Sequence, residues 1–314
     1  MSYLVTGGTG FIGAHIVRLL IQDGEKVVAY DMAPDQNLLE KLMGKEKSDW
    51  VKVVQGDITD LAHLIRTCQE SAVQKIIHTA ALLGSASSAN PLLAVRINCE
   101  GTVNVLETAR ILCLKRVVFA SSVAVFGPPE RYEQEYIPND APHYPSGIYG
   151  ACKSFNEACA RHYFNEYGVD SIAIRFTGVY GEGQSRGLGG AISEELFVKP
   201  VLGKPGKVPC GDDINNWLYV EDAARVMIMA SKVDTTKTRA FTVDGDVRSF
   251  AEAAAYVKSL IPEADITLLP GRTGFASNFD TAPVREEIGY RPEWTIEKGM
   301  KKIIDYIQRE NQAK

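Results

Sequence analysis

Several features that would place the chain in other protein classes are absent. The six cysteines include no CxxC pair, so we expect free thiols and no metal site. No apolar run is long enough to span a membrane. The first residues, MSYLVTGG, have neither the basic nor the apolar region of a signal peptide. We therefore expect a cytoplasmic protein with no membrane partner.

The chain also has no large excess of charge of either sign. The net charge is −5, and neither acidic nor basic residues form a long block. A basic surface for nucleic acid is therefore not expected. The composition, 45% hydrophobic and 23% charged over 314 residues, is that of a globular protein with room for one large domain or two unequal ones.

The first 175 residues alternate short apolar runs with helical patterns. The runs are apolar on both faces, which is typical of buried parallel strands. Because strands and helices take turns, the pattern predicts an α/β fold with a Rossmann-type, doubly wound parallel sheet. The expected strands are 3–6, 26–30, 51–54, 75–78, 116–120 and 171–175, and the expected helices are 11–23, 60–70, 91–113 and 149–167.

The chain changes character after residue 176. Glycine and proline cluster from 178 to 211, which indicates a smaller and less regular C-terminal lobe. We expect one domain over 1–176 and this lobe over 177–314, with some of its segments returning to the first domain. Within it, helices are expected at 220–232, 249–260 and 295–310, and strands at 239–243 and 265–269.

A glycine-rich turn, TGGTGFIG at 6–13, follows the first strand and opens a helix. Gly7 permits the tight turn, Gly10 lets the backbone approach a pyrophosphate, and Gly13 lets helix and strand pack closely. The alternative is an ordinary strand-turn-helix loop. The strand before the turn and the helix after it favour a dinucleotide site.

Two aspartates follow later strands of the same unit. Asp31 ends the second strand about 20 residues after the turn, where a carboxylate binds the adenosine ribose and repels a 2′-phosphate. This favours NAD over NADP, although Asp31 could also be a solvated turn residue. Asp57, after the third strand, could contact adenine or cap the helix that begins near Leu61; the sequence leaves both open.

A serine, a tyrosine and a lysine form a second pattern. The fifth strand ends in ASSVAVFG (120–127), and YGACK follows with Tyr149 and Lys153 four residues apart, on one helical face. A phenol has a pKa of about 10, so it needs a nearby cation to act as a base at neutral pH. A serine hydroxyl can then hold a substrate oxygen. A surface Tyr–Lys pair is the plain alternative.

These motifs resemble those of extended short-chain dehydrogenases/reductases, in the NAD-dependent epimerase/dehydratase family that includes UDP-glucose 4-epimerase-like proteins. The resemblance covers nearly the whole chain. It implies that 1–176 binds NAD and that 177–314 mainly binds substrate. It rests on TGGTGFIG, HTAA (78–81), INCEGTVNVLETAR (97–110), SSVAVFG, YGACK, WLYVEDAA (217–224) and DTAPVREEIGYRP (280–292).

The resemblance also implies roles for matching residues. The catalytic set would be Ser122, Tyr149 and Lys153, with Lys153 also bonding the nicotinamide ribose. Helices at 91–113 and 149–167 would form a homodimer interface, unless they are ordinary core helices. The cofactor contacts would be Gly7, Gly10, Phe11, Ile12 and Gly13 (pyrophosphate), Asp31 (ribose), Asp57 and Ile58 (adenine), Ala80 and Ala81 (the path to the nicotinamide), Asn98 and Phe176, with Tyr149 and Lys153; the substrate contacts would be Ser122, Val123, Tyr149, Gly178 and Val179.

The chain departs from its relatives at two places. Sugar dehydratases of this family carry an acidic pair where this chain has Val123 and Ala124, so dehydration is not expected. Epimerase relatives carry an asparagine at Gly178 and an arginine near Asn215 and Asn216, and both contact a nucleotide diphosphate. Losing these contacts should weaken diphosphate binding. Gly178 also leaves a gap that a bulkier group or a bound water could fill.

These patterns predict an NAD-dependent oxidoreductase. It would transfer hydride between NAD and a secondary alcohol or ketone of a small polar or sugar-like substrate, with Tyr149 as acid/base. The alternative is a nucleotide-sugar (UDP-sugar) 4-epimerase that retains NAD tightly. A non-catalytic NAD-sensing protein is a third hypothesis, weakened because Ser122, Tyr149 and Lys153 are all present.

Overall fold

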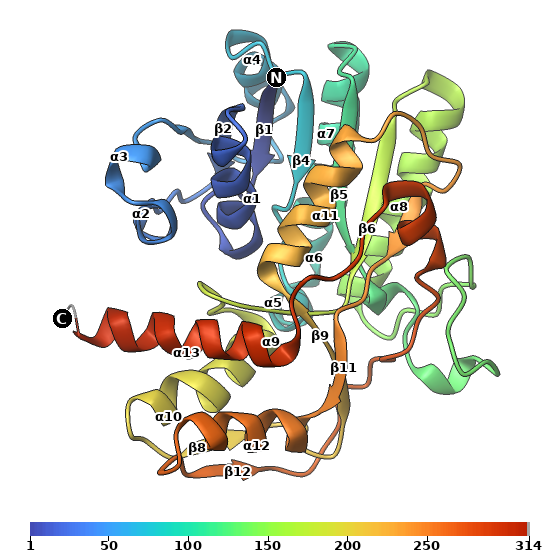
Figure 1. The fold of residues 1–314 in the computed structure, drawn as a ribbon. Helices are drawn as coiled ribbons and strands as arrows, with labels where there is room; N and C mark the ends of the chain where they lie inside the picture. Colours follow the sequence, from blue (N-terminus) through green and yellow to red (C-terminus); the bar gives the residue numbers. More distant parts are fainter. Residues whose placement is uncertain (313–314) are drawn as a thin grey trace.

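A computed structural model describes residues 1–312 of the chain. Figure 1 shows a large sheet with helices on both faces, and a smaller lobe of short strands and helices beside it. None of the helices in these residues combines the length and the apolar character needed to cross a membrane.

The large sheet has seven strands in the order β10-β6-β5-β4-β1-β2-β3, all paired in parallel. The predicted Rossmann-type sheet is thus confirmed. The seventh strand comes from the second half of the chain. The strands are β1 (Ser2–Thr6), β2 (Lys26–Asp31), β3 (Lys52–Gln55), β4 (Lys75–His78), β5 (Arg116–Ser122), β6 (Ser171–Phe176) and β10 (Ala240–Thr242).

The side chains of successive strand residues are buried in two separate hydrophobic cores, one on each face of the sheet. Tyr3 and Val5 pack with α1 and α11 on one face, while Leu4 packs with α4, α7 and α8 on the other. Both faces are therefore buried, as the uniformly apolar runs predict. These helices are α1 (Phe11–Gln22), α11 (Val220–Lys232), α4 (Leu61–Glu70), α7 (Gly101–Ile111) and α8 (Ile148–Tyr167); α2 (Asn37–Met43) and α3 (Lys45–Ser48) follow β2.

The helix expected over 91–113 is not continuous. It begins as α6 (Pro91–Ala94), widens into a π-helical segment, η1 (Val95–Glu100), and continues as α7. Such π segments often occur at functional sites, because they redirect side chains within a helix. Here the segment contains Asn98, which is buried. A short helix, α5 (Gly84–Ala89), precedes it.

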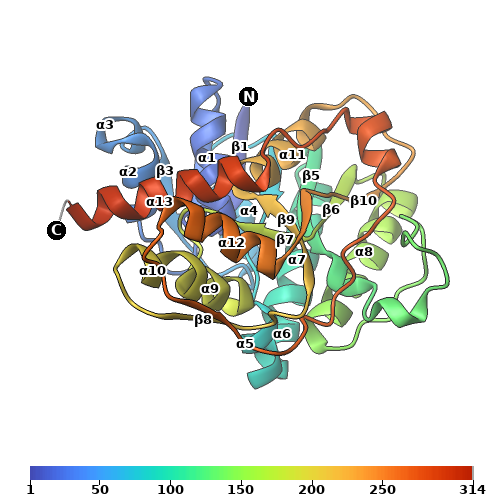
Figure 2. The ribbon, with the colours of Figure 1, turned by 60° about the horizontal axis from the view of Figure 1, so that its bottom comes forward.

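The smaller lobe has its own core, in which Trp217, Tyr219, Phe250 and Met300 are buried together. A three-stranded sheet, β11-β9-β7, and a two-stranded sheet, β12-β8, form its frame. Figure 2 shows its helices on the side that faces the viewer. The elements are β7 (Gly178–Tyr180), α9 (Gly187–Ser193), η4 (Glu194–Val198), α10 (Lys199–Val201), β8 (Gly206–Val208), β9 (Ile214–Tyr219), β11 (Asp246–Ser249), α12 (Phe250–Leu260), β12 (Ile266–Leu268) and α13 (Ile296–Gln312); three short helical turns are η2 (Val123–Val125), η3 (Pro129–Arg131) and η5 (Val284–Ile288).

Two buried histidines make the fold sensitive to acid. His15 on α1 contacts the backbone oxygen of Glu182 at 3.0 Å, and His78 at the end of β4 lies between the hydroxyls of Thr6 and Thr102, at 2.6 and 3.1 Å. Burial lowers the pKa of His15 to about 4 and that of His78 to about 3. Both imidazoles are therefore neutral in the folded protein at pH 7 and remain so at pH 5.

We expect the free energy of unfolding to fall by about 2 kcal/mol per histidine between pH 7 and pH 5. The unfolded chain protonates each imidazole below about pH 6.5, whereas the folded protein does not, so stability is complete above that pH and declines as the pH falls. Urea unfolding at both pH values measures this. His15→Gln should remove about half of the decline, and His162→Gln, at an exposed position, should leave it unchanged. An unaltered decline in His15→Gln would contradict this interpretation.

Candidate active site

The glycine turn brings the start of α1 close to the strand that precedes it. Gly7 has a φ of 65°, which favours glycine, and its amide donates to the Tyr30 carbonyl at 2.8 Å. A Cβ on Gly13 would lie 2.0 Å from the Gly7 oxygen, so this contact admits no side chain. Gly10 is the N-cap of α1, and no side chain caps the helix within residues 1–312. The amides of Phe11 and Ile12 are thus available to a pyrophosphate, and this turn fits NAD.

Asp31 lies beside the turn, as predicted for a ribose contact. Its carboxylate accepts hydrogen bonds from the Thr9 amide (3.3 Å) and the Thr9 hydroxyl (3.0 Å). These bonds hold the carboxylate at the carboxyl end of β2, where it remains partly exposed. The ribose role remains a prediction.

Replacing Asp31 by Asn should raise the Kd for NAD about 10-fold, because a charge-assisted contact to the ribose is lost. The same change should improve NADP binding relative to NAD, because it removes repulsion of the 2′-phosphate. Titrations of protein fluorescence with both cofactors measure this. Asp49→Asn makes the same charge change at an exposed site remote from the turn and should alter neither Kd. An equal loss for both cofactors would contradict the predicted role.

Asp57 does not cap the following helix. The N-cap of α4 is Asp60, whose carboxylate accepts the His63 amide at 2.9 Å, whereas Asp57 accepts the Thr59 amide at 2.8 Å. The capping alternative for Asp57 is therefore wrong, and the adenine contact stays a prediction. Its neighbour Ile58 is buried.

The segment that follows β4 is hydrogen-bonded to the end of β1 and to the π-helical segment η1. The Ala80 amide donates to the Thr6 hydroxyl at 3.3 Å. The Asn98 carboxamide accepts from the Leu82 amide at 2.8 Å and donates to the Leu82 carbonyl at 3.0 Å. Asn98 therefore positions the loop of Ala80, Ala81 and Leu82 from the π segment rather than presenting a free amide.

Ser122, Tyr149 and Lys153 come together at the carboxyl end of the sheet. Ser122 ends β5, pairs with Phe176 of β6, and accepts the Ala124 amide at 3.1 Å. Tyr149 lies in the first turn of α8. The Lys153 ammonium lies 5.5 Å from the centre of the Tyr149 ring and donates to the Ala120 carbonyl at 2.7 Å. The three side chains thus share one site.

The titration behaviour of this set differs from the expectation. Burial raises the pKa of Tyr149 to about 12, with the Ser122 hydroxyl acting in the opposite direction. Burial also lowers the pKa of Lys153 to about 8. In the protein alone, burial thus outweighs the opposing hydrogen bond of Ser122 on the pKa of Tyr149, and the phenol is protonated at neutral pH.

Glu157 is a buried residue that the sequence interpretation missed. It lies one turn after Lys153 on α8, and its carboxylate accepts from the Ser121 hydroxyl at 2.6 Å and from Arg175 Nε and Nη2 at 2.9 and 2.6 Å. Burial acts to raise the pKa of Glu157, but the bonds and charge of Arg175 outweigh it, so the pKa is lowered. The four-residue spacing from Lys153 was the available signal.

Val123, Gly178 and Val179 are the other residues predicted to contact substrate. Val123 is buried in η2, and Val179 is partly exposed in β7. A Cβ on Gly178 would lie 2.6 Å from Asn215 Oδ1 and 2.7 Å from its Nδ2. The gap left by Gly178 is therefore filled by a side chain of the protein itself, the carboxamide of Asn215 from β9.

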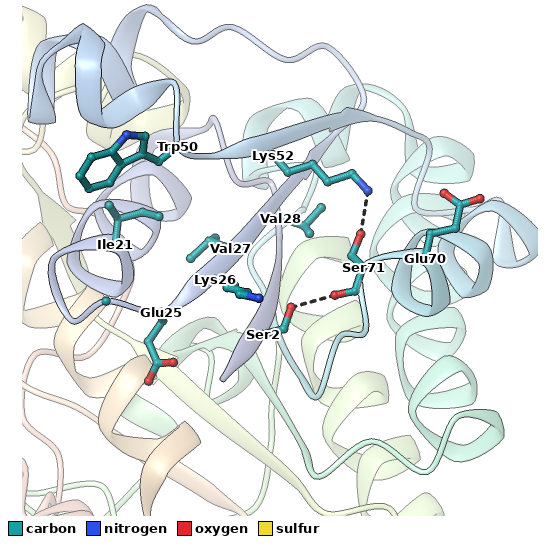
Figure 3. Close-up of a pocket in the computed structure, with 11 residues that line it drawn as sticks. Ser2, Ile21, Glu25, Lys26, Val27, Val28, Trp50, Lys52, Glu70 and Ser71 are labelled. Atoms are coloured by element: carbon teal, nitrogen blue, oxygen red, sulfur yellow. Dashed lines mark hydrogen bonds between the residues drawn. The ribbon is translucent and has the colours of Figure 1, made fainter.

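A surface hollow of about 570 Å³ lies at the end of the large sheet opposite to the candidate active site. It adjoins the amino ends of β1, β2 and β3, and Trp50 stands at its edge in Figure 3. Hydrogen bonds to Ser71 from Ser2 (to its carbonyl, 3.0 Å) and Lys52 (to its hydroxyl, 2.9 Å) cross its floor. Ligands of doubly wound sheets bind at the carboxyl ends of the strands, so this hollow is not the cofactor site.

The fold and the cofactor turn define an NAD-dependent enzyme of the extended short-chain dehydrogenase/reductase type. The model of the "NAD dependent epimerase/dehydratase family" matches residues 3–243, and the chain belongs to this family. A UDP-glucose 4-epimerase of Mycolicibacterium smegmatis is 29% identical over 99% of this chain and 100% of its own.

Solved structures include both epimerases and dehydrogenases. A UDP-glucose 4-epimerase of Thermus thermophilus, in complex with NAD, is 25% identical with a TM-score of 0.82 over 98% of this chain and 99% of its own. An L-threonine dehydrogenase of Cupriavidus necator shares the fold at 22% identity, with a TM-score of 0.85 over 97% and 99% of the two chains. The cofactor is NAD, and the substrate is left open by these relatives.

Proposed function

We propose that the protein is an NAD-dependent dehydrogenase or reductase of a small polar or sugar-like substrate with a secondary alcohol or ketone. One observation carries the proposal. The set of Ser122, Tyr149 and Lys153 is complete, and the space at Gly178 in the smaller lobe is filled by the neutral carboxamide of Asn215. Diphosphates are bound most strongly by charged groups, and this chain has Asn215 and Asn216 where the epimerase relatives carry an arginine, so the loss of that cation favours a substrate without a diphosphate.

Each catalytic side chain has a distinct task in this reaction. NAD held at the glycine turn of Gly7, Gly10 and Gly13 would supply the hydride acceptor. Ser122 hydrogen-bonds the substrate oxygen, and Tyr149 takes the hydroxyl proton as the alcohol becomes a ketone. Because the pKa of Tyr149 is about 12 in the protein alone, positive charge must favour its phenolate during the reaction. Lys153, 5.5 Å from the ring centre, supplies part of that charge.

A spectrophotometric screen tests the proposal. The enzyme is incubated with NAD and a panel of secondary alcohols, beginning with L-threonine because several structural neighbours are L-threonine dehydrogenases. We expect NADH to accumulate steadily with one of them, at the rate of ketone formation. Formation of an epimer without net NADH would reject the proposal.

A UDP-sugar 4-epimerase is the second candidate. It is favoured by the relatives named UDP-glucose 4-epimerase that match the chain over almost its whole length. Calorimetry with UDP separates the two candidates. Micromolar binding would favour the epimerase, whereas binding too weak to measure would favour the dehydrogenase.

We also propose that the protein is a homodimer joined through α6, η1, α7 and α8. Apolar side chains on these elements are exposed in the single chain, where they would be covered by the same helices of a second copy. Light scattering coupled to gel filtration tests this, and a monomer mass at micromolar concentration would contradict it. The exposed residues are Leu92 (74%), Val95 (44%), Ile111 (45%), Phe155 (46%) and Tyr167 (54%).

A further inference from the structure

The Asn215 side chain and Gly178 form a matched pair on neighbouring strands. β9 pairs with β7 in parallel, with Trp217 opposite Gly178, and Asn215 precedes Trp217 by two residues, so all three face the same side. Because the carboxamide atoms lie 2.6 and 2.7 Å from the position of a Cβ on Gly178, any larger residue there would displace them. We call this space, bounded by Gly178 and the Asn215 carboxamide, the Gly178 notch.

The notch lies next to the catalytic end of the sheet. Phe176 is the β6 partner of Ser122, and Gly178 follows it by two residues. An extended chain advances about 3.3 Å per residue, which places Gly178 about 7 Å along the chain from that partner. The far end of a small substrate whose oxygen is held by Ser122 would therefore reach the Gly178 notch.

The two neighbouring asparagines differ in what they bind. The Asn216 carboxamide is buried, and all its bonds are within the protein. It accepts hydrogen bonds from the Thr177 hydroxyl (3.1 Å) and the Gly245 amide (2.8 Å) and donates to the Ser277 carbonyl (2.9 Å). The Asn215 side chain is partly exposed and makes no hydrogen bond to any residue between 1 and 312. Its donor and its acceptor are both available to a ligand.

The cation opposite Asn215 already has a carboxylate partner. The residue opposite Asn215 on β11 is Arg248, which forms an ion pair with Asp246 at 3.1 Å. Its cation is thus paired with a carboxylate, and the polar group that fills the notch itself is an uncharged amide. Such an amide can donate to and accept from a hydroxyl or carboxylate of a small substrate.

We propose that the Asn215 carboxamide, held in the Gly178 notch, is a specificity-determining contact that hydrogen-bonds the polar far end of a small substrate. The inference rests on the proposed function, because it concerns the substrate of the same site. It assigns a binding role to an amide supplied from β9 and a permissive role to the glycine on β7.

Steady-state kinetics of Asn215→Ala tests the inference, with L-threonine as the first probe and otherwise the panel alcohol that wild type oxidises fastest. We expect the KM for the alcohol to rise about 10-fold, with kcat within about 2-fold and the KM for NAD unchanged. Ile214→Ala, at the exposed neighbouring position on β9, should leave all three constants unchanged. An unchanged KM for the alcohol in Asn215→Ala would overturn the inference.

A swap of the two residues guards against a purely structural effect. Asn215→Gly should raise the KM as Asn215→Ala does, and Gly178→Asn alone should clash with Asn215. Combining both changes returns one amide to the notch and should bring the KM back towards wild type, after a small shift from the Asn216 carbonyl, which lies 2.9 Å from the new Cβ. A double variant that folds normally and keeps the raised KM would contradict a role for the amide.

Failure of the proposed function would be visible separately, in the wild type. If wild type interconverts UDP-glucose and its epimer without net NADH, the dehydrogenase proposal fails. The same KM comparison, made with UDP-glucose, then tests Asn215 by itself, and an unchanged KM would again overturn its role.

Discussion

Tyr149→Phe is expected to lower kcat by about 10²- to 10⁴-fold while leaving the Kd for NAD within a few-fold of wild type. Phenylalanine keeps the ring that packs in the first turn of α8 and removes only the oxygen that takes the substrate proton. A residual rate in this variant would come from solvent bases and should rise with pH, because no phenol remains to take the proton. Rates with NAD and the best alcohol, together with fluorescence titration of NAD, measure both quantities.

Tyr167→Phe is the matched control for this variant. Tyr167 lies at the other end of α8 and is 54% exposed, so its hydroxyl should not affect turnover. If Tyr149→Phe retained turnover within 10-fold of wild type, the assignment of Tyr149 as acid/base would be wrong. A protein that binds NAD but turns over no substrate in either form would instead favour the non-catalytic hypothesis.

Glu157→Ala is expected to lower the free energy of unfolding by about 3–5 kcal/mol. The change leaves the Arg175 guanidinium, which is 4% exposed, without its bidentate partner in the interior. It also frees the Ser121 hydroxyl, next to Ser122, so kcat should fall even where the protein stays folded. Urea unfolding and steady-state rates at a temperature well below the transition measure the two effects.

Two controls test whether the stability loss comes from burial of the Glu157–Arg175 ion pair rather than from loss of any ion pair. Glu107→Ala breaks the comparable bidentate pair with Arg110 at the exposed face of α7, and should cost far less stability. Replacing Glu157 by Leu and Arg175 by Met together should cost less than Glu157→Ala, because no unpaired charge stays buried. Equal losses in the buried and exposed single variants would contradict the explanation.

The large sheet could be predicted because its strands are apolar on both faces. Runs such as KIIH (75–78) have no polar alternation, and the structure has β4 at the same residues. In the small lobe, the run at 265–269 predicts β12, but β7 and β9 could not be predicted in this way. β9 begins with INN, and its partner Gly178 belongs to a glycine-rich loop, so neither shows the apolar run of a buried strand. Their pairing depends on the fold that surrounds them.

The site divides in the same manner. Tyr149 and Lys153 are predicted from their shared helical face, which is a local pattern, whereas the choice of Ser122 among the serines at the end of β5 comes from the family resemblance. The occupant of the Gly178 notch lies 37 residues further along the chain and becomes a neighbour only through the pairing of β7 with β9. Likewise, the bond of Glu157 to Arg175 joins α8 to β6. Contacts of this kind are tertiary, and local spacing does not encode them.

The number of NADH molecules formed per enzyme molecule tests the central claim most directly. Wild type is mixed with excess NAD and the substrate that turns over, and NADH is followed by its absorbance until the reaction stops. A dehydrogenase that releases its product should form on the order of a hundred NADH per enzyme or more, limited only by NAD, substrate and the reaction equilibrium. A plateau at or below one NADH per enzyme, with epimer accumulating, would contradict the account.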